Sequence, residues 1–154
     1  MATLTVTHTE TLTLGDGDGT ERGTTNVQTI TVDQVDSRIV GVPTLGLSFL
    51  SFGTMPAAGT FQYSKVKYLR ITNIDPTNFV TLGIKKSDSE YFVKLYPEAS
   101  DLGYNSFYLG DPVMDANEET GSGLGAFTLA NIHDITIKAD TATAKVELFV
   151  ASID

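Results

Sequence analysis

The chain has 154 residues and a formal net charge of −9, from 19 acidic and 10 basic residues. This length suits a single domain that buries a core without covalent staples. The absence of cysteine excludes disulfide scaffolds, thiolate zinc sites and thiol nucleophiles.

The distribution of charge argues against two classes of partner. Apart from Lys85 and Lys86, the basic residues are scattered, so no basic patch is expected to bind nucleic acid or an anionic membrane. No stretch approaches the roughly 20 apolar residues of a membrane span. The start, MATLTVTHTE, lacks the basic and apolar regions of a signal peptide.

The opening stretch TLTVTHTETLTL, residues 3–14, has threonine at every odd position. Side chains alternate faces along a strand, so residues 1–14 are predicted to form a strand or arm with an all-threonine face. His8 and Glu10 interrupt the apolar residues of the other face, which favours an arm that packs at its two ends and contacts a neighbour between them. We expect the subunit or capsid interface to include Leu4, Thr5, Val6, Thr7 and Thr9.

Two pairings remain open for this strand. It could form a hairpin with residues 24–33 across the glycine-rich turn at residues 15–19, which is the simpler arrangement, or exchange with another subunit.

Short β-rich segments between turn residues continue to the end of the chain. The strand at residues 65–73 is expected to pair with 79–86 across the turn at Asp75 and Pro76. Nine or ten strands predict an all-β fold, an antiparallel, jelly-roll-like β-sandwich formed as one domain by residues 1–154. The other predicted strands are 24–33, 38–42, 45–52, 90–95, 106–109, 134–139 and 145–151.

Residues 110–125, GDPVMDANEETGSGLG, form a long acidic, glycine-rich segment without a strand pattern. Loops of this length are often functional. Pro112, Met114 and Asp115 are therefore further candidates for the subunit or capsid interface.

No catalytic, cofactor-binding or metal-binding residues are assigned. The run DGDGTE at residues 16–21 offers acidic oxygens, but Glu21 and Val27 stand where a calcium loop needs glycine and glutamate. A plain turn is favoured there, with a cation left open. His8 and His133 have no metal-ligand spacing, and the G-x-S-x-G motif is absent, so we expect a protein that is not an enzyme.

Aromatic residues gather between positions 91 and 108. Exposed tyrosines could form a platform for sugar rings, but burial in a core or interface is the favoured role. Arrays of alternating threonines also occur in ice-binding proteins, where several rows stack into a flat face. This sequence predicts only one such row. The aromatic residues are Tyr91, Phe92, Tyr96, Tyr104, Phe107 and Tyr108.

The middle of the chain resembles a family of small virion proteins of tailed phages. The resemblance rests on YLRITN at 68–73, DPTNFVTLG at 75–83 and KLYPE at 94–98, followed by strands at 135–139 and 146–151. Glu98 stands where such proteins commonly have glycine. The family implies a capsid decoration (cement) protein, a β-sandwich that self-associates, usually as a homotrimer, on the major capsid protein.

That resemblance implies a location on the outer surface of the virion capsid after assembly in the host cytoplasm. The alternative is a glycan- or receptor-binding module of a head or tail fibre. A metal-dependent hydrolase using Asp16 or Asp18 is a third possibility.

Overall fold

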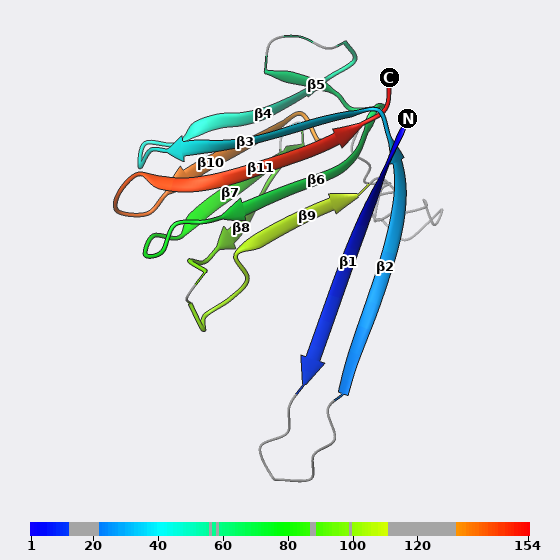
Figure 1. The fold of residues 1–154 in the computed structure, drawn as a ribbon. Coiled ribbons are helices and arrows are strands. Elements are labelled where there is room, and N and C mark those ends of the chain that lie inside the picture. Colours follow the sequence, from blue (N-terminus) through cyan, green and yellow to red (C-terminus); the bar gives the residue numbers. More distant parts are fainter. Residues whose placement is uncertain (13–21, 56, 58, 87–88, 99, 111–131) are drawn as a thin grey trace, which may run out of the picture. The chain divides into compact units, whose positions relative to one another are not determined.

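The computed structural model describes residues 1–12, 22–55, 57, 59–86, 89–98, 100–110 and 132–154 (Figure 1). These residues form strands joined by turns, with no helix among them, so the all-β prediction is confirmed. The chain divides into two compact units, Met1–Asp33 and Gln34–Asp154.

The first unit is a two-stranded antiparallel hairpin of β1 (Ala2–Leu12) and β2 (Arg22–Val32). Its register runs without interruption from Ala2 opposite Val32 to Leu12 opposite Arg22. Of the two pairings that the sequence leaves open, the structure has the hairpin. Residues 13–21, which include the glycine-rich turn, lie outside the described residues.

The second unit is an antiparallel sandwich of two sheets, with one parallel pair, β4–β5 (Figure 1). One sheet has the order β3-β11-β6-β9, formed by Gln34–Val42, Ala144–Ser152, Val66–Asn73 and Ser106–Gly110. The other has the order β5-β4-β10-β7-β8, formed by Thr60–Gln62, Leu47–Gly53, Asp134–Ala139, Val80–Lys86 and Ser89–Leu95. This strand order does not establish a jelly roll.

The core lies between these two sheets. Leu69 and Leu148 of the four-stranded sheet and Leu82 and Ile135 of the five-stranded sheet have no exposed surface and belong to one apolar cluster. The alternation of buried and more exposed residues along β10 and β11 follows from the two-residue period of a strand. Burial of each such side chain contributes about 1.5–3 kcal/mol to folding.

The predicted hairpin of residues 65–73 and 79–86 is wrong. β6 pairs with β11 and β9, whereas β7 pairs with β10 and β8, so the turn between them carries the chain from one sheet to the other. The reason lies in this turn, because it is bonded to both sheets. The Ile74 amide donates to the Lys145 carbonyl in β11, and the Asn73 side-chain amide donates to the Leu95 carbonyl in β8.

Two buried polar side chains, Asn73 and Asp75, organise this corner. Asn73 Nδ2 donates to the carbonyls of Asn78 (2.9 Å) and Leu95 (3.1 Å), and Asn73 Oδ1 accepts from the Asp75 amide at 3.0 Å. Asp75 Oδ1 accepts from the amides of Thr77 and Asn78 at 3.0 and 2.8 Å. Burial raises the pKa of Asp75, but these hydrogen bonds from Asn78 and Thr77 outweigh it and hold the pKa below its ordinary value.

Two further details of the sandwich were not predicted. β5 is a strand of 3 residues, too short to show a pattern. The pairing of β6 with β11 shifts register near Lys67, so Val66 joins Leu69 and Ile71 in the core instead of lying on the face of Tyr68 and Arg70. Such a bulge reverses the facing of the residues beyond it.

Candidate functional site

The structure places the predicted interface residues of the hairpin on both faces of β1. Thr5, Thr7 and Thr9 lie on one face and are exposed, whereas Leu4 and Val6 lie on the other and are half-buried. Pro112, Met114 and Asp115 lie outside the described residues, as do Asp16 and Asp18.

The threonine face of the hairpin is broader than the sequence suggests. Residues opposite each other in an antiparallel pair share a face, so the threonines of β1 are joined by Thr25, Thr29 and Thr31 of β2. The expectation of a single row is therefore wrong. The hydroxyls of Thr9 and Thr25 lie 3.5 Å apart across the strands. The full set, here called the threonine face, is Thr3, Thr5, Thr7, Thr9, Thr11, Gly23, Thr25, Val27, Thr29 and Thr31, and all of these residues are exposed.

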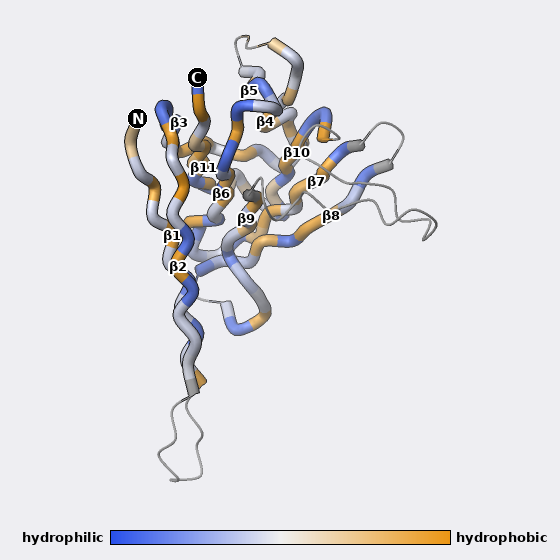
Figure 2. Tube along the Cα trace, turned by 90° about the vertical axis from the view of Figure 1, so that its right-hand side faces the viewer, coloured by the Kyte–Doolittle hydropathy of each residue, from blue (hydrophilic) through white to orange (hydrophobic). Residues whose placement is uncertain are grey.

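The other face of the hairpin changes character along its length. Leu4, Val6, Ile30 and Val32 gather towards one end and are half-buried or buried, and Figure 2 shows most of the hairpin's apolar segments in the half nearer the N-terminus. Leu12, at the opposite end, is 54% exposed. The described strand therefore lacks the expected packing at this second end.

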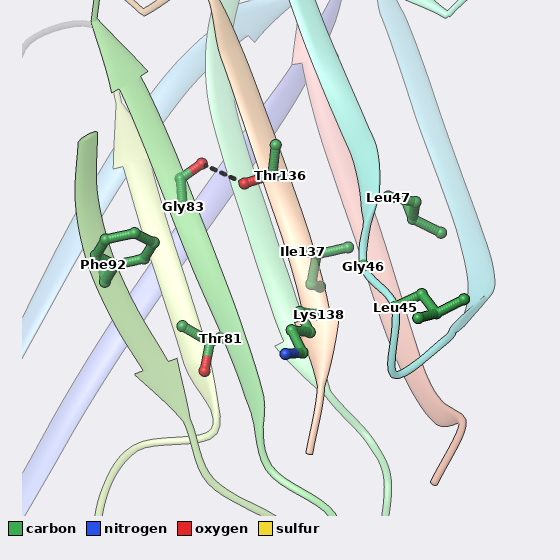
Figure 3. A pocket seen from close by; sticks show the side chains of 9 residues that line it. All are labelled: Leu45, Gly46, Leu47, Thr81, Gly83, Phe92, Thr136, Ile137 and Lys138. Carbon is green, nitrogen blue, oxygen red and sulfur yellow. Dashed lines mark hydrogen bonds between the residues drawn. The ribbon is translucent and has the colours of Figure 1, made fainter. Parts of the chain in front are cut away.

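An open groove lies on the outer face of the five-stranded sheet, away from the core (Figure 3). It has a volume of about 490 Å³. Phe92 of β8 and Leu45, in the turn before β4, line it from opposite sides, and these two side chains are 63% and 95% exposed. Between them lie residues of β7 and β10: Thr81, Gly83, Thr136, Ile137 and Lys138.

Gly83 determines the shape of this groove because it has no side chain. Thr136 Oγ1 donates to the Gly83 carbonyl at 3.3 Å and lies the same distance from Glu90 Oε1. A Cβ atom at Gly83 would lie 2.5 Å from Thr136 Oγ1 and closer still to Glu90 Oε1. The groove thus combines an exposed aromatic ring with the hydroxyl groups of Thr81 and Thr136 and the ammonium group of Lys138.

Burial in the core of the chain is wrong for several of the aromatic residues, and their burial in an interface stays a prediction. Tyr91, Phe92, Tyr104 and Tyr108 are exposed, with Tyr104 at 87%. Phe107 packs against the core, as expected. The exposed residues lie on β8 and β9, the outermost strands of their sheets, or in the turn between them, where one side of a strand has no neighbour to cover it.

The outer face of the four-stranded sheet carries a second polar and aromatic cluster. Arg70 Nη2 donates to Glu147 Oε2 at 2.5 Å, and the Arg70 guanidinium lies 5.6 Å from the centre of the Phe149 ring. Burial raises the pKa of Tyr68, with a further rise from Tyr108 and a partial reduction from Arg70. Arg70 Nε is buried and has no hydrogen-bond partner among the described residues, so the pairing of Arg70 with Glu147 leaves one donor unsatisfied.

The described residues contain neither a metal-binding cluster nor a membrane-spanning helix. No group of three or more histidine, cysteine, aspartate or glutamate side chains lies close enough to hold a metal ion within that part of the chain. The same residues include no helix of the length and apolarity that crossing a membrane requires.

Comparison with known proteins identified no relative: no family model, curated protein or solved structure matches this chain.

Proposed function

We propose that this protein is a non-enzymatic virion component, a capsid decoration protein that self-associates and stabilises the outer surface of a phage head by binding the major capsid protein. The observation that carries the proposal is the hairpin, which forms its own compact unit and exposes the whole threonine face. A monomer gains nothing from an extended ribbon with an exposed face, whereas an assembly protein can cover it with a neighbour.

The physical properties of the hairpin support this reading. An isolated two-stranded hairpin is marginally stable in water, and this one has strands of 11 residues each. Contact with another protein would remove β-branched surface from water and stabilise the ribbon. The hairpin is therefore suited to a role in which its partner is another protein surface.

The charge and the resemblance to small tailed-phage virion proteins agree with a location on the outside of a capsid. A net charge of −9 disfavours binding to packaged DNA. A protein that binds the assembled shell more tightly than free capsid subunits stabilises the shell by mass action.

The test is to add the purified chain to capsids of tailed phages that lack their decoration protein, and then to heat the particles. We expect the protein to sediment with the shells and to raise the temperature at which they break. Failure to bind, or binding without a gain in shell stability, would contradict the proposal.

Two matched variants check the role of the hairpin in this assay. Thr7→Lys adds a positive charge to the threonine face, and Thr143→Lys adds the same charge to the exposed turn between β10 and β11. We expect only Thr7→Lys to weaken shell binding. If both variants weakened binding equally, the added charge would explain the effect and the threonine face would have no specific role.

A second function, a glycan- or receptor-binding module, is favoured by the groove on the five-stranded sheet. An exposed aromatic ring beside hydrogen-bonding groups suits a sugar ring, and in this groove Phe92 lines the same space as Thr136 and Lys138.

A glycan array distinguishes this function. Binding that is lost in Phe92→Ala and kept in Tyr104→Ala would support it, because Tyr104 is also exposed but does not line the groove. The absence of binding by the unsubstituted protein would exclude it for the glycans tested.

A further inference from the structure

The outer edge of β1 lacks the features that usually prevent strand addition. Natural edge strands are protected by lysine, proline, bulges or short length. β1 has 11 residues with neither lysine nor proline, and its register with β2 is uninterrupted. Its one acidic residue, Glu10, lies near the end that leads into the turn.

The outer edge of β2 is similar. Among the described strands, each of β1 and β2 pairs with the other alone, so each has one unpaired edge. β2 also lacks lysine and proline, and its one charged residue, Arg22, is the first of the strand. The hairpin therefore presents two unprotected edges that run antiparallel to each other.

The lack of charge on the hairpin favours contact between two copies of this chain. Copies of a chain with a net charge of −9 repel one another, yet no residue of the threonine face is charged. From Thr3 to Thr9 and from Thr24 to Val32 the strands contain no aspartate, glutamate, lysine or arginine. Repulsion between copies is therefore smallest where the edges are unprotected.

We propose that the outer edge of β1 pairs with the outer edge of β2 of a second copy, so that hairpins of neighbouring subunits form one continuous antiparallel sheet. This head-to-tail pairing covers both edges of every hairpin when the copies close into a ring. Pairing β1 with β1 of a second copy would leave both β2 edges open. The inference rests on the self-association in the proposed function and names the contact responsible for it.

The alternation of side chains restricts the register of this contact. Threonine faces remain on one side of the shared sheet only if threonines of β1 lie opposite residues such as Thr25, Val27 and Thr29 of the partner's β2. A shift by one residue would place Leu4 and Val6 of one copy on the threonine side of the other.

The absence of cysteine makes a direct test possible, because any introduced thiol is the only one in its chain. Thr7→Cys is co-expressed in turn with Thr25→Cys, Val27→Cys and Thr29→Cys, oxidised, and analysed for disulfide-linked dimers. Opposed Cβ atoms in a sheet lie close to the separation that a disulfide needs. Separate chains are used because Thr7 and Val27 also face each other within one hairpin.

We expect one mixture to form several-fold more linked dimer than Thr7→Cys alone or than Thr7→Cys with Thr143→Cys. Linkage of Thr7→Cys to itself would overturn the head-to-tail pairing. Yields no higher than the Thr143→Cys mixture would overturn strand addition altogether.

This experiment contains no capsid, so its failure is distinguishable from failure of the proposed function. Protein that forms the linked dimers but does not bind shells would contradict decoration alone. Shell binding by protein that does not cross-link would contradict strand addition alone.

Discussion

Replacing Asn73 with alanine tests whether the corner between β6 and β7 holds the two sheets together. The substitution removes two hydrogen bonds donated by Nδ2 and one accepted by Oδ1, all in a residue without exposed surface. Each contributes about 0.5–1.5 kcal/mol net, and buried groups left without partners cost more. We expect the free energy of unfolding to fall by about 2–4 kcal/mol.

The assay is urea and thermal unfolding followed by circular dichroism. For a protein of this size, 1 kcal/mol corresponds to a change in Tm of about 2–4 °C, so Asn73→Ala should lower Tm by roughly 4–16 °C. The control is Thr141→Ala, which removes the exposed hydrogen bond from Thr141 Oγ1 to Asn78 Oδ1. This control should change stability by less than about 0.5 kcal/mol.

Asn73→Asp adds a second, independent check. An aspartate would keep the oxygen that accepts from the Asp75 amide, but its ionised carboxylate would face the carbonyls of Asn78 and Leu95. Its pKa would be raised on folding, so the loss of stability should shrink as pH falls through that raised pKa. A loss below about 1 kcal/mol in Asn73→Ala, or a pH-independent loss in Asn73→Asp, would refute the role of this corner.

Three other predictions concern single side chains. Because the pKa of Asp75 is lowered on folding, its contribution to stability is complete above the unfolded-state pKa of about 4 and is lost as pH falls further. The urea midpoints of the unsubstituted protein and Asp75→Asn should therefore converge in acid, and parallel pH profiles would contradict this. Gly83→Ala should lower the free energy of unfolding by about 1–3 kcal/mol because its Cβ would crowd Thr136 and Glu90. Gly41→Ala should be nearly neutral in the same unfolding assay, because its Cβ would meet Thr143 Cγ2 at an ordinary 3.6 Å. Glu147→Gln should lower the free energy of unfolding by about 1 kcal/mol or less because the side chains of Glu147 and Arg70 are each 33% exposed. This loss should shrink in high salt, and a loss that is insensitive to salt would contradict an ionic contribution.

The sequence predicted the strands well because their patterns are local. The alternating threonines of β1 and the alternation along β10 and β11 each specify a strand without reference to distant residues. The turn residues between Asn73 and Asn78 were also recognisable, because asparagine, aspartate and proline have defined roles in turns.

The pairing of strands was harder to predict because it depends on distant contacts. A strand, a turn and a strand can form either a hairpin within one sheet or a crossing between sheets. The crossing at residues 73–80 depends on carbonyls of Lys145 and Leu95, which are far away in sequence. The bulge near Lys67 likewise appears only when β6 is aligned with β11.

The candidate surfaces were likewise predictable only where they depend on local patterns. The threonine row of β1 is visible in the sequence, but its partners on β2 follow from the register, because residues 22–32 show no strict alternation of threonine. The groove beside Phe92 combines residues of β7, β8 and β10 with the turn before β4, and no sequence spacing links them.

The central claim is that this chain works as an assembled structural component whose copies join through their hairpins. The most direct measurement is the molar mass of the purified, full-length protein by light scattering over a range of concentrations. We expect a discrete oligomer of three chains. A single-chain mass at every concentration would contradict it.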